Sequence, residues 1–191
     1  MRLHEEKIWP RILAVDLLML CVSFSMATVG QMRDYIEAAY GLTVGEGGLL
    51  ISMQSIGGFA VTVMAIVFID SFNAKKLIVL SGLLTGFFII GVGIDQPLTA
   101  LFMVFILLGF FAGIVKTLVN SVMYQTVHRN VERHMTLLHV MFSLAAVIAP
   151  IASYTLYQSF DLFGAFLAIG GVSVLFAVYA LFAFKKNFGQ K

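Results

Sequence analysis

Two polar residues inside a long apolar stretch are the strongest chemical signal in this sequence. Lys116 and Asn120 lie four residues apart within the run 98–125, so a helix would place them one turn apart on one face. A lysine at the centre of a membrane helix costs about 2.5–3.5 kcal/mol on insertion scales, so its ammonium group needs a partner, water or a solute. We hypothesise that Lys116 contacts a solute. The alternative is a structural ion pair with Asp16.

Other polar residues in the apolar runs extend this candidate site. Asp16 lies about one turn inside the first run, a depth from which its carboxylate can also reach the membrane surface. His139 is similarly shallow, and its imidazole could exchange protons near neutral pH or hydrogen-bond between packed helices. The residues expected to line a solute cavity are Asp16, Gln31, Gln54, Lys116, Asn120 and His139.

Six long apolar runs must position these residues. Hydrophobic residues make up 60% of the chain and the mean hydropathy is +0.98, whereas soluble domains are about 45–50% apolar. A bilayer core takes roughly 20 apolar residues of helix. The sequence therefore predicts an all-α membrane protein with spans at 11–32, 45–69, 76–94, 98–125, 134–157 and 162–184.

The basic residues predict the orientation of these spans. Ten of the twelve lysines and arginines fall in the terminal segments and in the links after the second and fourth spans, and Arg33 alone falls in the other links. Basic loops stay in the cytoplasm, so we expect a multi-pass protein of the cell (inner or plasma) membrane with both termini cytoplasmic.

The distribution of polar residues predicts an internal repeat. The third and sixth spans are almost purely apolar apart from glycines, which makes them candidates for outer, lipid-facing supports. The link 70–74 (DSFNA) also resembles the segment 161–165 (DLFGA), in which Asn73 and Gly164 suit left-handed turns. We therefore predict two three-helix units of opposite orientation, 1–94 and 95–184, followed by a basic tail, 185–191.

Local patterns predict how the helices begin and meet. Thr43 and Glu46 have the spacing of a capping box that opens the second span. Gly82 with Gly86, and Gly109 with Gly113, each place two small residues on one helix face, which lets neighbouring backbones approach closely. His128, Glu132 and His134 do not have the spacing of a zinc site, and we expect neither a metal nor another cofactor.

With these features the chain resembles the amino-terminal half of a major facilitator superfamily transporter. The link 66–76 is similar to that family's G-x-x-x-D-R-x-G-R-K signature at Asp70, Lys75 and Lys76, which implies a gating loop there. The run 109–120 (GFFAGIVKTLVN) and the run 137–143 (LLHVMFS) are similar to the fucose-permease and sugar-porter branch. Lys116 stands where members of that branch commonly carry a carboxylate, which suits an anionic solute.

The resemblance implies secondary transport of a small polar solute, a sugar or an organic anion, by alternating access. Family members place the solute between two six-helix halves, so we expect a half-transporter that forms a homodimer or pairs with a second six-helix half. The alternatives are a non-transporting membrane module that stabilises or regulates a partner, and a truncated transporter fragment. No catalytic or phosphate-binding motif occurs, so we expect no enzyme, and the small net charge of +2 does not indicate nucleic acid.

Overall fold

The computed structural model describes residues 8–68, 73–127 and 130–184, and all of its regular elements there are helices. Five of them are long and apolar enough to cross a membrane. This confirms an all-helical protein with the composition of a membrane protein. The helices are α2 (Trp9–Gln31), the short α3 (Arg33–Tyr40), α4 (Val44–Phe68), α5 (Ala74–Val92), α6 (Leu98–Thr126) and α7 (Val131–Phe184).

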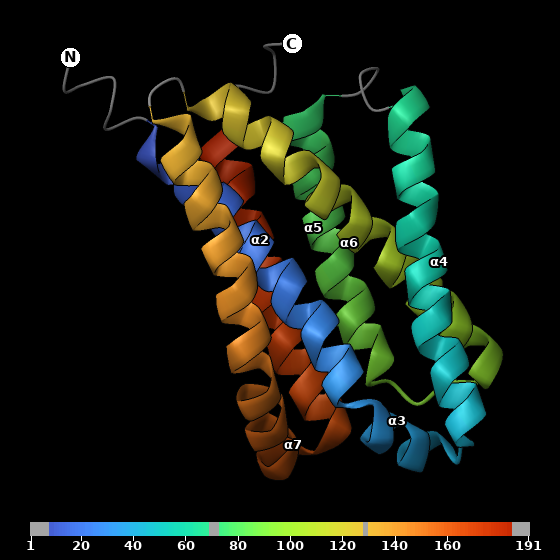
Figure 1. The fold of residues 1–191 in the computed structure, drawn as a ribbon. Coiled ribbons are helices and arrows are strands. Elements are labelled where there is room, and N and C mark those ends of the chain that lie inside the picture. The colour runs from blue at the N-terminus through green and yellow to red at the C-terminus, as the bar shows by residue number, and fades with distance from the viewer. Residues whose placement is uncertain (1–7, 69–72, 128–129, 185–191) are drawn as a thin grey trace.

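Helix α7 is a helical hairpin that contains the fifth and sixth predicted spans. Its 54 residues would extend about 80 Å if straight, far more than the bilayer core. The backbone leaves the helical region only at Asp161 (φ 62°, ψ −171°), where the chain reverses (Figure 1). We call 131–160 the first arm and 162–184 the second arm. The first arm therefore continues three residues beyond the predicted end of the fifth span at 157, and the sixth span begins at 162 as predicted.

Side-chain caps explain where several helices begin. The predicted capping box is confirmed: the Thr43 N–H donates to Glu46 Oε2 (2.8 Å) and the Glu46 N–H donates to Thr43 Oγ1 (3.3 Å). Asn73 Oδ1 accepts the N–H groups of Lys75 and Lys76 (3.1 and 3.2 Å), and Asp161 Oδ1 accepts the N–H of Gly164 (2.9 Å). Each cap opens an arm or helix that runs antiparallel to the preceding membrane-length helix (Figure 1).

The prediction of left-handed turns at Asn73 and Gly164 is wrong. Asn73 has an extended backbone (φ −73°, ψ 104°), which its capping role requires. Gly164 lies within the second arm, and the positive φ belongs to Asp161 instead.

The sequence did not predict α3, which lies between the first and second spans. The Arg33 guanidinium donates to Glu37 (2.6 Å) and to the Val44 carbonyl (2.7 Å), and the Tyr40 hydroxyl donates to the Ile94 carbonyl (2.5 Å). Burial raises the pKa of Tyr40, so its phenol keeps its proton at neutral pH. These bonds connect α3 to the start of α4 and to the α5–α6 link.

The bundle has two edges and a packed middle. Figure 1 shows α4 and the first arm of α7 at opposite edges, with α2, α5 and α6 between them. The chief contacts are α2 with α7, α4 with α6, and α5 with both α6 and α7. The beginnings of α2, α5 and α7 and the end of α6 meet at one end of the bundle. We call it the basic end, because Arg11, Lys75, Lys76 and Arg133 lie there.

Glycines let the helix backbones touch, as their spacing predicts. A Cβ atom at Gly109 would overlap the Gln54 carbonyl on α4, and one at Gly57 would overlap the Ile106 carbonyl on α6. On the other side of the bundle, a Cβ at Gly86 or at Gly170 would lie within 3 Å of the carbonyl oxygen of the other glycine. These contacts separate two apolar clusters, one towards the basic end and one towards the opposite end.

Gly109→Ala should destabilise the bundle, because the new methyl group would have to push α4 away from α6. We expect the free energy of unfolding to fall by about 1–3 kcal/mol, the usual cost of overpacking. The matched control is Gly171→Ala on the second arm, where the added methyl group meets nothing within 4 Å. Titration with SDS in mixed micelles measures both variants, and equal unfolding midpoints would contradict the packing described here.

Candidate functional site

A line of polar side chains follows the outward face of α6. Neighbours on the opposite face of the helix, among them Val115, Val119 and Val122, are fully buried in the bundle. The polar line itself is exposed or half-buried. We call it the polar strip, and its members are Lys116, Thr117, Asn120 and Ser121.

Lys116 points towards the first arm of α7. Its Nζ lies 5.3 Å from the centre of the Phe142 ring, a cation–π contact worth about 0.5–1 kcal/mol at an exposed site. Lys116 forms no ion pair with Asp16, because the only salt bridge within the described residues joins Arg33 to Glu37. The ammonium group therefore keeps its hydrogen-bonding capacity for water or a solute.

Asn120 provides the matching acceptor. Its Oδ1 is buried and has no hydrogen-bond partner within the described part of the chain. An unsatisfied buried acceptor costs about 1–3 kcal/mol, so a ligand hydroxyl or N–H group that reached it would recover that free energy. An ammonium donor and an amide acceptor one turn apart can together bind a solute that carries both oxygen acceptors and hydroxyl donors.

The structure brings His139 to the same part of the molecule. His139 is exposed on the first arm, three residues before Phe142 and therefore on the same side of the helix. Its carbonyl accepts the Ser143 hydroxyl (3.1 Å), while its ring has no hydrogen bond within the described residues. Helix α6 ends at the basic end, and the first arm begins there. His139 and Asn120 are therefore both closer to the basic end than the contact between Lys116 and Phe142 is.

The other three predicted residues lie elsewhere. Gln31 is exposed at the far end of α2, about 22 Å along the helix from Asp16. Gln54 is only 5% exposed and belongs to the stretch of α4 that touches Gly109. Asp16 is 6% exposed near the basic end, and its Oδ1 has no hydrogen-bond partner. No single small solute could contact both Asp16 and Gln31.

The predicted gating loop is only partly described. Asp70 lies outside the described residues. Lys75 and Lys76 occupy the first turn of α5, where Lys75 is half-buried and Lys76 is exposed. Within the described residues, no group of three histidine, cysteine or acidic side chains could hold a metal ion.

Sequence reasoning missed Phe142 as a member of this site. The available signal was its position one turn after His139, within the run 137–143 that is similar to the sugar-porter branch. That similarity does not indicate a contact with Lys116, which only the three-dimensional structure identifies.

Comparison with protein families places this geometry in context. The family model of the Major Facilitator Superfamily matches residues 15–190. The chain belongs to the Major Facilitator Superfamily. A search of curated proteins found no match. The family match makes the chain a multi-pass membrane transporter of the major facilitator type rather than an enzyme. It covers α2 from residue 15, the other four spanning helices and the polar strip.

Water should reach the polar strip in the folded protein. In a Cys21→Ala background, which removes the chain's single cysteine, a cysteine placed at Thr117 should react readily with a water-soluble maleimide. The control is Ser173→Cys, whose native hydroxyl is buried 3.4 Å from that of Ser25. We expect labelling at Thr117 to be at least about ten times faster, because thiol reactivity follows exposure. Equal rates in membrane vesicles would show that the strip is covered.

Proposed function

We propose that this chain is one half of a secondary transporter that moves a small polar solute, a sugar or an organic anion, by alternating access. The observation that carries this proposal is the polar strip of α6, where the exposed ammonium group of Lys116 lies one turn from Asn120, whose buried amide oxygen has no partner within the described residues. Lipid cannot solvate these groups, so a second surface must enclose them together with water. A second copy of this chain or another six-helix half provides such a surface.

The helix arrangement supports a three-plus-three inverted repeat. In this scheme α2 corresponds to α6, α4 to the first arm of α7, and α5 to the second arm. The packing of α4 on α6 is then matched by the contact of the first arm with α2, seen between Trp9 and His134. The packing of α5 on α6 is matched by the contact of the second arm with α2, seen between Ser25 and Ser173. Starts of corresponding helices lie about 88 residues apart in all three pairs.

The capping residues refine the alignment of the two units. Asn73 opens α5 and Asp161 opens the second arm, each with its side-chain oxygen on a backbone N–H three residues later. Asn73 therefore corresponds to Asp161, in place of the pairing of Asp70 with Asp161 that sequence similarity suggested. Inverted repeats of this kind are the usual basis of alternating access.

The solute class follows from the groups on the strip. Lys116 only donates hydrogen bonds and is positively charged, Asn120 offers an acceptor, and Phe142 offers an aromatic face. A molecule that carries hydroxyl groups as well as oxygen acceptors, such as a sugar or a hydroxy acid, offers a partner to both polar groups. This agrees with the resemblance of 109–120 and 137–143 to the sugar-porter branch.

The orientation follows from the two ends of the bundle. Arg11, Lys75, Lys76 and Arg133 lie at the basic end, whereas Arg33 lies at the other end and is paired with Glu37. The positive-inside rule places the basic end, and with it both termini, in the cytoplasm of a cell whose inner or plasma membrane holds the protein.

Lys116→Met should abolish transport while leaving the fold intact. The substitution keeps the length and apolar stem of the side chain but removes the charge that contacts the solute. Uptake is measured in vesicles with radiolabelled hexoses and with lactate or gluconate, after a thermal-shift screen of the same compounds. Lys116→Arg should keep part of the uptake, since it restores the charge.

Uptake measured at different numbers of chains per vesicle tests whether a second half is needed. If two copies form the transporter, uptake per chain should fall as the vesicles are diluted towards a single chain each. Undiminished uptake by Lys116→Met would remove this residue from the solute site. Failure of every compound in both measurements would favour a non-transporting membrane module.

Labelling of intact cells should confirm the orientation. In the Cys21→Ala background, Asp95→Cys in the exposed α5–α6 link should react with a membrane-impermeant maleimide from outside. Lys76→Cys, also exposed but at the basic end, should react only after the membrane is permeabilised. The reverse pattern would place the termini outside the cytoplasm.

A further inference from the structure

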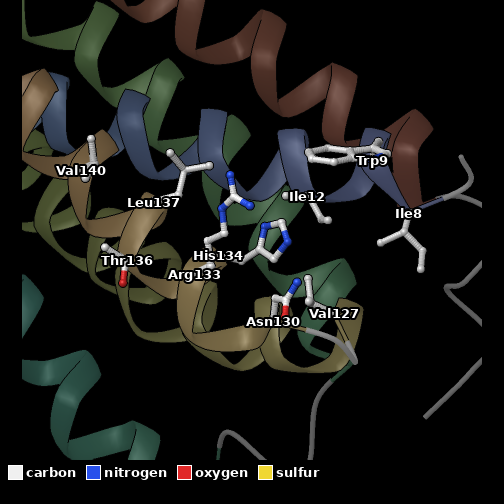
Figure 2. Close-up of a pocket in the computed structure, with 10 residues that line it drawn as sticks. All are labelled: Ile8, Trp9, Ile12, Val127, Asn130, Arg133, His134, Thr136, Leu137 and Val140. Carbon is white, nitrogen blue, oxygen red and sulfur yellow. The ribbon is translucent and has the colours of Figure 1, made fainter. Parts of the chain in front are cut away.

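A pocket of about 740 Å³ opens at the basic end of the bundle, away from the polar strip. It lies between the start of α2 and the start of α7, beside the end of α6 (Figure 2). Its volume is in the range of about 300–1,000 Å³ that small-molecule sites occupy. None of the residues predicted to bind solute lines it.

The pocket has an apolar wall and a polar wall. Ile8, Trp9 and Ile12 of α2 face Leu137 and Val140 of the first arm, and together they form the apolar wall. The polar wall comes from the beginning of the first arm. It consists of Asn130, Arg133, His134 and Thr136.

The two basic side chains of the polar wall have no hydrogen-bond or ion-pair partner within the described residues. The exposed guanidinium group of Arg133 makes no hydrogen bond or ion pair there, and Figure 2 shows it extending from α7 towards α2. The Nδ1 atom of His134 is buried and has no hydrogen-bond partner in the same part of the chain. The ring of His134 meets Trp9 edge-on, with 6.1 Å between ring centres.

Among the described residues, no aspartate or glutamate lines the pocket. The guanidinium group of Arg133 therefore gives this described lining a positive charge. Asp16, the nearest acidic residue along α2, lies one turn beyond Ile12 and is almost fully buried. An anion that entered the pocket would meet unpaired donors on one side and an apolar surface on the other.

We propose that this pocket binds the phosphate group of an anionic membrane lipid, with the upper part of an acyl chain lying along the apolar wall. A guanidinium group matches phosphate oxygens in a bidentate manner. Basic pockets between membrane helices on the cytoplasmic side are a recurrent mode of lipid headgroup binding. The apolar wall favours a lipid over a water-soluble phosphate, since a soluble anion would leave that wall unused. This site is independent of the polar strip and of the solute that the protein moves.

Trp9 provides a direct probe, because it is the only tryptophan of the chain and lines the pocket. The protein is reconstituted in phosphatidylcholine vesicles that contain increasing fractions of phosphatidylglycerol brominated on the upper acyl chain. Bromine quenches tryptophan fluorescence on contact. We expect half-maximal quenching at a several-fold lower mole fraction than with brominated phosphatidylcholine.

Variants separate the pocket from general surface charge. Arg133→Gln should abolish the preference for phosphatidylglycerol, and His134→Gln should weaken it. Lys76→Gln removes a basic residue from the same end of the bundle but outside the pocket, so it should keep the preference. The unfolding midpoint of each variant serves as the check on folding.

Three results would overturn the proposal. The first is equal quenching of the wild-type protein by the two brominated lipids. The second is an equal loss of preference in Arg133→Gln and Lys76→Gln, which would indicate attraction to the surface as a whole. The third is relief of quenching by glycerol phosphate or inorganic phosphate added to the water, which would assign the pocket to a soluble anion.

Discussion

The close contact of helix backbones at glycines is the interaction on which the rest of this bundle depends. Lipid tails are as apolar as leucine, so burial of apolar side chains does not drive helices together within a membrane. Close approach of backbones supplies van der Waals contact instead. The chain uses it twice, where Gly57 and Gly109 join α4 to α6 and where Gly86 and Gly170 join α5 to the second arm of α7. Buried serine and threonine side chains lie at about the same level on α2, α5 and the second arm.

These contacts also determine which face of α6 remains available for chemistry. One side of α6 meets α4 through Gly109 and Gly113, and another side is buried in the core through Val115 and Val119. Lys116 and Asn120 occupy the side that is left. The polar strip thus lies on the side of α6 that packing leaves uncovered, and a lysine one residue earlier, at the position of Val115, would be buried.

Sequence patterns predicted the spans but could not assign their faces. Apolar length located all six segments within a few residues, and the capping box of Thr43 and Glu46 was readable because its two bonds are local. Helix α3 was not predicted, because eight residues of mixed polarity are too short and too polar to indicate a membrane span. Its hydrogen bonds to Val44 and Ile94 also join residues that are distant in the sequence. The sequence suggested that Gln54 lines a cavity, whereas the structure packs its backbone against Gly109 of α6. The aromatic partner of Lys116 depends on the register between α6 and the first arm, which no local pattern contains.

The single-residue reversal at Asp161 has a mechanical consequence. With one non-helical residue between two long arms and a carboxylate fastened to the N–H of Gly164, the hairpin contains no slack. Tilting one arm must carry the other with it, together with the α2 and α5 surfaces on which they rest. By contrast, α4 packs chiefly on α6, through the glycine contacts and through buried side chains such as Leu50 and Val61. Because α4 rests on one long helix and the hairpin rests on two, a tilt of α4 would disturb fewer helix contacts than a tilt of the hairpin.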